Sequence, residues 1–191
     1  MLSNCSKGYL SCYDCYKKGD SIRLERTQEL LDALALAMID YDAGSAERIQ
    51  HFLKVHSFSQ LIGIREGMDA HSLFILETAA YVHDIGIKAA EEKYGRQNGR
   101  LQEQEGPALA EAMLEKLGFD MDVIQRVSFL VGHHHTYENV DGMDWQILLE
   151  ADYLVNAYEC QIAGKGIYAA RERIFRTETG KELCVKLYGD V

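Results

Sequence analysis

The stretch LFILETAAYVHDIG, residues 73–86, decides the fold of this chain. Its first ten residues are apolar nearly all round a helix, which predicts a central, buried helix. His83 and Asp84 follow at the end of this run, and Gly86 lies just beyond them as a helix stop. An ionised carboxylate in such a place costs on the order of several kcal/mol without a partner. The stretch therefore predicts either a metal cation bound by His83 and Asp84 or a buried hydrogen bond between them.

The composition favours a single all-α domain. Hydrophobic residues make up 47% of the 191 positions, which excludes wholesale disorder and allows one sizeable core. Only one proline is present, and few segments alternate polar and apolar residues as strands do. We therefore expect an all-α, single-domain helical bundle over residues 23–191, preceded by a tail of residues 1–22.

The charge of the chain restricts its partners. The 20 basic and 30 acidic residues give a net charge of 20 − 30 = −10. Such a surface disfavours non-specific binding to DNA or to an anionic membrane, but it permits a small anionic substrate held at a metal. No apolar stretch is long enough to span a bilayer, and the N-terminus lacks a signal-peptide core. The sequence thus predicts a cytoplasmic protein with reduced cysteines.

The tail contains a cluster of cysteines. Cys12 and Cys15 form a C-x-x-C pair, and Cys5 offers a third thiolate. A structural zinc site requires four ligands, and no second pair follows at the spacing of a zinc finger. We expect a mobile or loosely docked tail, with a zinc or redox site as the alternative.

Helical periodicity extends over most of the domain. Apolar positions at helical spacing, with their cap and stop residues, predict helices over residues 24–42, 45–62, 69–82, 107–118, 120–131 and 145–160. A short helical piece is expected over residues 89–94, and the composition of residues 96–100 is typical of a loop. Two or three shorter helices are expected near the C-terminus.

Side chains that can bind metals recur beside the apolar faces of these helices. His51 borders the face of one helix, and His56 is its rival on the same helix. Residues 133–135 are three consecutive histidines just past an apolar helix, for which a solvated turn is the alternative. Asp152 shares the apolar face of the last long helix, where an unpaired charge is costly. Together with the His-Asp pair of the central helix, these imidazoles and carboxylates suit Mn, Fe, Co, Ni or Zn, and suit Mg less well.

The order His…His-Asp…Asp resembles the HD superfamily of metal-dependent phosphohydrolases. Residues 48–55 (RIQHFLKV) are similar to its first helix, and residues 83–86 (HDIG) are similar to its namesake motif. Residues 150–154 (EADYL) are similar to its closing aspartate segment. The resemblance covers about residues 45–160 and implies a helical bundle of the HD-domain type.

The resemblance also implies a set of metal ligands, and it favours His51 over its rival on the same helix. The set is His51, His83, Asp84 and Asp152. Many two-metal members carry a further histidine before the glycine that opens the next helix, whereas residues 102–107 here contain none. We therefore expect one metal ion. Two ions are the alternative, with Glu105, His133 or His134 as additional ligands.

The activity implied by the resemblance is hydrolysis of a phosphomonoester, phosphodiester or phosphoanhydride in a nucleotide or other small phosphorylated molecule. A bound divalent metal would activate water for attack and polarise the phosphoryl oxygen. Asp84 would ligate the metal and orient the nucleophile, and His133 or His134 would assist proton transfer to the leaving group. Arg48 and Lys88 are candidates for binding the phosphate charge, with solvated surface charges as the alternative.

Two other functions fit the same ligands. One is a di-iron oxygenase, against which the missing intermediate histidine argues. The other is a non-catalytic sensor or binding module that keeps the metal as a structural staple, which needs no open coordination position. A small phosphorylated molecule is the expected partner, and a homodimer is open as the oligomeric state.

Overall fold

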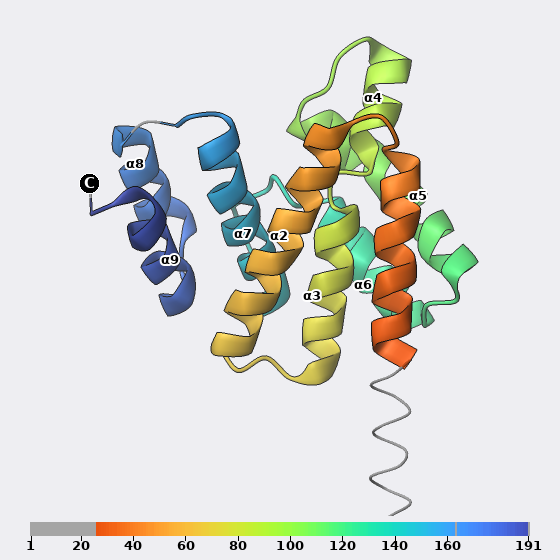
Figure 1. Ribbon diagram of the computed structural model, residues 1–191, viewed down its shortest axis with the longest axis horizontal. Coiled ribbons are helices and arrows are strands. Elements are labelled where there is room, and N and C mark those ends of the chain that lie inside the picture. Colours follow the sequence, from red (N-terminus) through yellow and green to blue (C-terminus); the bar gives the residue numbers. More distant parts are fainter. Residues whose placement is uncertain (1–25, 163, 191) are drawn as a thin grey trace, which may run out of the picture.

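The computed structural model describes residues 26–162 and 164–190, and this part of the chain consists of α-helices without strands (Figure 1). The predicted all-α class is confirmed. A helix over residues 26–41 is followed by α2 (Ala46–Arg65), α3 (Ala70–Val82), α4 (Gly86–Tyr94), α5 (Gly99–Leu117), α6 (Met121–Val131), α7 (Met143–Glu159), α8 (Gly164–Ile174) and α9 (Glu178–Tyr188). The predicted tail of residues 1–22, with its cysteines, lies outside the described residues. Among the described helices, none combines the length and apolar character needed to cross a bilayer.

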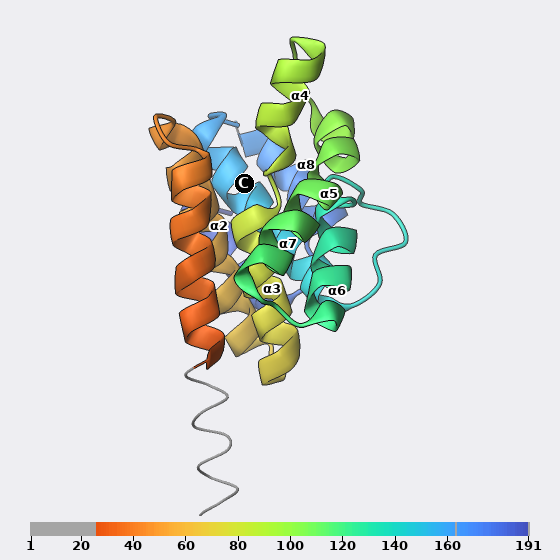
Figure 2. The ribbon, with the colours of Figure 1, turned by 90° about the vertical axis from the view of Figure 1, so that its right-hand side faces the viewer.

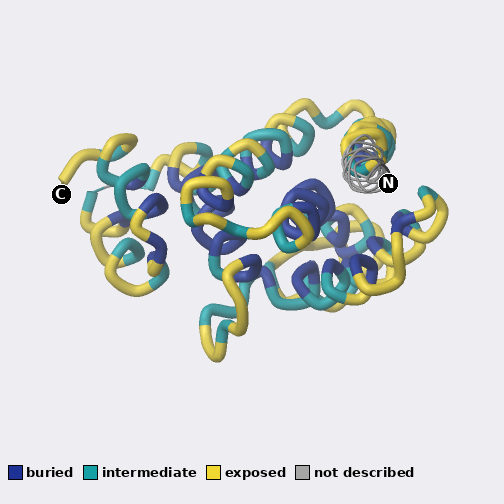
Figure 3. Tube along the Cα trace, turned by 90° about the horizontal axis from the view of Figure 1, so that it is seen from below, coloured by how far each residue is buried: buried dark blue, intermediate teal, exposed yellow. Residues whose placement is uncertain are grey.

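Helix α3 forms the centre of the bundle, as its apolar sequence predicted. All of residues 74–82 are buried. Asp69 begins the helix, because its side chain accepts hydrogen bonds from the backbone N–H groups of His71 and Ser72. Helix α3 packs against α2, α6 and α7, and Figure 3 shows buried residues on the faces turned toward the middle of the bundle. The end of α3, which carries the His-Asp pair, is therefore held on several sides.

Helices α4 and α5 cross directly after the His-Asp pair, and α4 projects from one end of the bundle (Figure 2). A Cβ atom on Gly86 would lie 2.6 Å from the backbone oxygen of Gln102 and 2.8 Å from the backbone nitrogen of Gly106. Carbon atoms do not approach backbone atoms this closely, so the crossing requires glycine at position 86. The crossing fixes where the chain leaves α3 and so helps to place Asp84.

Helix α2 is longer than the sequence predicted. It continues through Gly63 to Arg65, whereas its periodicity suggested an end near residue 62. A Cβ atom on Gly63 would lie 2.8 Å from the side chain of Leu73, at the start of α3. This glycine allows two helices to pack closely and does not stop the first of them.

Helix α5 begins earlier than the sequence predicted, at Gly99 and not at Pro107. Asn98 caps it, because its side chain accepts a hydrogen bond from the backbone N–H of Leu101. Pro107 lies inside the helix, where it removes one backbone hydrogen bond. The polar composition of residues 99–106 concealed this first part of the helix.

A buried carboxylate fastens the C-terminal helices to the bundle. Glu150 of α7 is fully buried, and its Oε1 accepts hydrogen bonds from the backbone N–H groups of Arg176 at 2.6 Å and Thr177 at 2.9 Å. The side chain of Gln146 donates to the same oxygen at 2.7 Å, and the Thr177 hydroxyl donates to Oε2. The hydrogen bonds from Arg176 and Thr177 hold the connection between α8 and α9 against α7.

Candidate metal centre

Four side chains, from α2, the turn that follows α3, and α7, converge inside the bundle. His51 Nε2 lies 3.2 Å from His83 Nε2 and 3.2 Å from Asp152 Oδ1. Asp84 Oδ2 lies 3.5 Å from His51 Nε2 and 3.6 Å from His83 Nε2. His83 Nε2 and Asp152 Oδ1 are 3.5 Å apart. The structure thus brings together all four residues expected as metal ligands.

The spacing of these atoms fits one shared ion. Ligand atoms about 2.1 Å from a tetrahedrally coordinated ion are roughly 3.4 Å apart. The separations in the cluster run from 3.2 to 3.6 Å. Among the described residues, His51, His83 and Asp84 form one of the groups that could hold a metal ion.

The histidines present Nε2 to the cluster because Nδ1 is engaged elsewhere. His83 Nδ1 donates to the carbonyl of Ala80 at 2.9 Å, and His134 Nδ1 donates to the carbonyl of Val131 at 2.7 Å. His51 Nδ1 bonds to a carboxylate oxygen of Glu159 at 2.8 Å. A carbonyl or carboxylate oxygen only accepts, so each Nδ1 carries a proton. In the neutral form of each imidazole, the Nε2 lone pair is then directed toward the cluster and can bind a cation.

His134 adds a second position to the cluster. Its side chain is fully buried, and its Nε2 has no hydrogen-bond partner in the described structure. The nearest carboxylate oxygen is Asp84 Oδ1, at 3.3 Å. Asp84, His134 and His135 form a further group that could hold a metal ion, so Asp84 is shared between two positions. A buried nitrogen without a partner is costly, and a cation would satisfy it.

The electrostatics of the cluster favour a positive charge at its centre. Burial lowers the pKa of His51, but its hydrogen bond to Asp152 and the charges of Asp152 and Asp84 together raise it to about 9. Burial raises the pKa of Asp84, and the charge of His83 then brings it below its usual range. The pKa of Asp152 is also lowered, because its hydrogen bonds to His51 and His83 outweigh its burial. The cluster thus attracts a proton, and a metal cation can take the proton's place.

One edge of the cluster faces solvent. The Asp84 side chain keeps 24% of its area exposed, whereas the side chains of His83 and His134 are completely enclosed. A bound ion would therefore be held from inside the bundle and reached from the Asp84 side.

Comparison with protein families identifies the fold. Residues 48–163, more than half of the chain, match the family model described as HD domain. The chain belongs to the HD-domain family. The resemblance inferred from the sequence is confirmed, and the match includes all four converging residues. No curated protein matches the chain.

Two solved structures are similar to this HD domain. One is a predicted HD superfamily hydrolase from an uncultured Thermotogales bacterium, with 27% sequence identity, a TM-score of 0.56 and 83% of each chain covered. The other is YpgQ from Bacillus subtilis, with 18% identity and a TM-score of 0.59 over 84% of this chain and 87% of that chain. The second similarity shows the fold alone.

Two histidines singled out in the sequence lie outside the cluster of this HD domain. The ring of His133 stacks on Phe129 and packs edge-on against Trp145, and its Nδ1 donates to the Phe129 carbonyl at 2.7 Å. His56 stacks on Tyr81, with ring centroids 4.1 Å apart. The structure therefore places His134, and not His133, beside Asp84.

Glu105 does not join the cluster either. Its carboxylate accepts hydrogen bonds from Lys93 at 3.0 Å and from the Tyr94 hydroxyl at 2.8 Å. These contacts tie α5 to α4 on the exposed side of the two helices. The structure therefore does not place Glu105 where the missing histidine would bind a metal.

The two cations expected to bind phosphate differ in their availability. Arg48 pairs with Glu91 at 2.5 Å and lies 3.9 Å from Asp42. Lys88 makes no ion pair with a described residue, and its ammonium lies 5.3 Å from the centroid of the Tyr41 ring. Lys88 is therefore the freer charge on this side of the cluster.

Glu159 is a site residue that the sequence analysis missed. Besides bonding to His51, its carboxylate accepts a hydrogen bond from Lys54 at 2.5 Å. Its position seven residues after Asp152, two turns along the same helix face, was the available signal.

His135 was grouped in the sequence only with its two neighbouring histidines. In the structure it bonds through Nε2 to the side-chain oxygen of Gln102.

We expect Glu159→Gln to weaken metal binding by about 10- to 100-fold, because the amide orients His51 less firmly and lowers its basicity. Calorimetric titration of metal-free protein with Zn²⁺ or Mn²⁺ measures this change. Glu172→Gln, which removes an exposed acid from α8, is the matched control. Equal affinities for the two variants would contradict the role of Glu159.

Proposed function

We propose that this HD domain hydrolyses a phosphate ester or anhydride in a nucleotide or another small phosphorylated molecule, using a divalent transition metal. The observation that carries the proposal is the convergence of buried imidazoles and carboxylates on one point with an exposed edge at Asp84. A structural staple would need no such edge. Similarity to a solved protein described as a predicted HD superfamily hydrolase supports hydrolysis over the other functions.

Some residues of the cluster would bind the ion, and others would take part in proton transfer. A bound divalent cation supplies Lewis acidity, which makes water more acidic and offsets the charge of a phosphoryl group. His51, His83 and Asp152 would hold the ion from inside. Asp84 faces this position with Oδ2 and His134 with Oδ1, so it links the two.

His134 is suited to one of two roles. Burial lowers its pKa, but Asp84 and Asp152 raise it above its usual value overall, so its Nε2 can hold a proton destined for the leaving group. Alternatively, the same nitrogen would hold a second ion together with Asp84. Lys88, which makes no ion pair with a described residue, would help to bind the phosphate charge.

Metal analysis followed by a substrate screen tests the proposal. Nucleotides, phosphomonoesters, phosphodiesters and phosphoanhydrides are offered to protein shown to be metal-loaded. We expect turnover of at least one compound, its loss on chelation, and its recovery on adding back Mn²⁺, Co²⁺, Ni²⁺, Fe²⁺ or Zn²⁺. Fully loaded protein that turns over none of them contradicts the proposal. Bound iron together with substrate-dependent oxygen uptake would indicate an oxygenase instead.

Metal binding is expected to release protons in a pH-dependent way. His51 has a folded-state pKa of about 9, so its imidazole is protonated near neutral pH in the metal-free protein. An ion binds only the neutral form, so about one proton leaves per ion at about pH 7 and almost none above about pH 10. Calorimetric titrations in buffers of different ionisation enthalpy count these protons. Equal proton release at both pH values would contradict the assignment of His51.

A further inference from the structure

A surface hollow shares α7 with the expected metal ligand Asp152. It has a volume of about 300 Å³ and is lined by α7, α8, the connection between α6 and α7, and the connection between α8 and α9. Its polar lining consists of Tyr137, Asn139, Gln146, Arg173 and Arg176. We call it the Arg173 cavity. Among the described residues, two arginines and no acid line it, although acids outnumber bases by 30 to 20 in the chain.

The Arg173 cavity and the metal cluster share structural elements. Leu149 lines the cavity, and Asp152 follows it by one turn on α7. Tyr137 lines the cavity three residues after His134. The cavity and the cluster are therefore both built on α7 and on the segment that follows α6.

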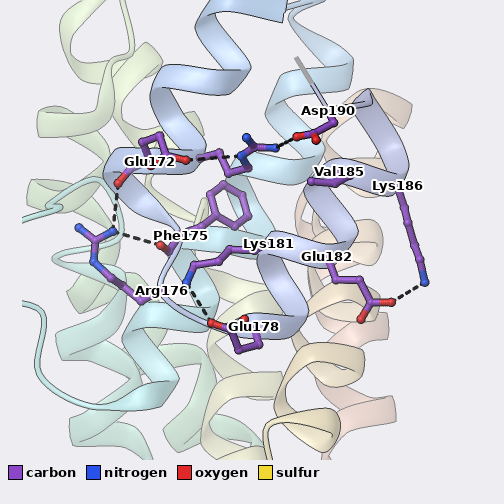
Figure 4. Close-up of a pocket in the computed structure, with 10 residues that line it drawn as sticks. Glu172, Phe175, Arg176, Glu178, Lys181, Glu182, Val185, Lys186 and Asp190 are labelled. Carbon is purple, nitrogen blue, oxygen red and sulfur yellow. Dashed lines mark hydrogen bonds and ion pairs between the residues drawn. The ribbon is translucent and has the colours of Figure 1, made fainter.

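The hydrogen bonds of the lining leave Arg173 available. The Arg176 guanidinium donates to the backbone carbonyls of Glu172 and Phe175 (Figure 4). It also donates to the backbone carbonyl of Arg173. Arg173 makes no ion pair or side-chain hydrogen bond with any described residue, and neither does the hydroxyl of Tyr137. An arginine that lines a cavity without an acid to neutralise it is a ready partner for an anion.

A larger hollow of about 680 Å³ on the surface of α8 and α9 shows the contrast (Figure 4). Three ion pairs neutralise most of its charged side chains. The pairs are Arg171 with Asp190, Lys181 with Glu178 and Lys186 with Glu182. The Arg173 cavity, by comparison, has unmatched positive charge.

We propose that the Arg173 cavity is a subsite for a second phosphate group of the substrate, bound by the Arg173 guanidinium and the Tyr137 hydroxyl. This inference rests on the proposed function, because it assumes that the reacting phosphoryl group lies at the metal cluster. It restricts the substrate class to molecules that carry at least two phosphate groups. Arg173 then determines specificity, and the chemistry of the reacting phosphate remains with the cluster.

Binding of inorganic phosphates to the metal-loaded protein tests the subsite without any need for turnover. Phosphate, pyrophosphate and triphosphate are titrated calorimetrically, and phosphorus NMR verifies that each probe stays intact. We expect Arg173→Gln to weaken pyrophosphate or triphosphate about tenfold and to leave phosphate unchanged. Arg173→Lys should restore part of the loss, and Tyr137→Phe should weaken the same probes by a smaller factor. Lys165→Gln removes an exposed charge from the same helix and is the matched control.

The outcomes separate the subsite from the proposed function. If Arg173→Gln weakens no probe, or weakens all three equally, the subsite is wrong even if the protein hydrolyses phosphates. If the length dependence appears but no phosphate compound is turned over, the subsite holds and hydrolysis fails. Once a substrate is known, Arg173→Gln should raise its KM about tenfold and leave kcat nearly unchanged.

Discussion

Asp84→Asn is expected to reduce hydrolysis by the metal-supplemented protein on the order of a thousandfold, because several kcal/mol of charge stabilisation depend on the ion and its ligands. Asp84 is the member of the cluster that faces both solvent and His134, and the amide removes its negative charge. The measurement is kcat/KM on the best compound of the screen, together with the metal content of the same sample. The metal content shows whether the variant loses the ion or keeps it in a less active site.

Glu105→Gln is the control for this loss. Glu105 was a candidate ligand in the sequence, but its carboxylate bonds to Lys93 and Tyr94. We expect the control to keep its metal and its activity within about twofold, as for a group that touches neither the ion nor the substrate. Asp84→Asn protein with unchanged activity would remove the main support for a metal-dependent reaction at this cluster.

Glu150→Ala is expected to lower the free energy of unfolding by about 3 kcal/mol or more. The change leaves two backbone N–H groups and the Thr177 hydroxyl without their acceptor, and each unsatisfied buried group costs about 1–3 kcal/mol. The carboxylate also fills the space beside Gly180, where a Cβ atom would meet Glu150. Urea denaturation followed by circular dichroism measures the loss.

Two further variants show whether the hydrogen bonds cause this loss. Glu172→Ala removes an exposed acid from α8 and should change stability by less than about 0.5 kcal/mol. Glu150→Gln keeps the size of the side chain but turns one acceptor into a donor, so it should still lose about 1–3 kcal/mol. A Glu150→Ala protein as stable as the Glu172→Ala control would show that the α8–α9 connection does not depend on this carboxylate.

The sequence predicted the centre of the fold better than its edges. Residues 73–82 are apolar nearly all round the helix, and such a pattern predicts a buried helix. The start of α5 could not be predicted in this way, because residues 99–106 are polar and their helix depends on the cap at Asn98 and the packing at Gly106. The prediction of the end of α2 was wrong for a related reason, because the sequence does not show whether Gly63 stops a helix or packs against one.

The residues of the candidate site were likewise predicted only in part. Residues in the recognised motifs, such as His51 and Asp152, were found from their order along the chain. The choice between His133 and His134 was not available from sequence, because both follow the end of α6 directly. It depends on Phe129 and Trp145, whose rings enclose His133 and leave His134 to point at Asp84. Whether these residues act as ligands stays a prediction for the metal titrations.

The hydrogen bonds from His83 and His134 to backbone carbonyls orient both imidazoles before an ion binds. Each imidazole donates to the carbonyl oxygen of the residue three positions earlier, so a single turn of backbone fixes the orientation of the ring. Capture of the ion then requires little ordering of side chains, which lowers the entropic cost of binding it. A chelated sample should therefore retain its shape and refill without passing through an unfolded state.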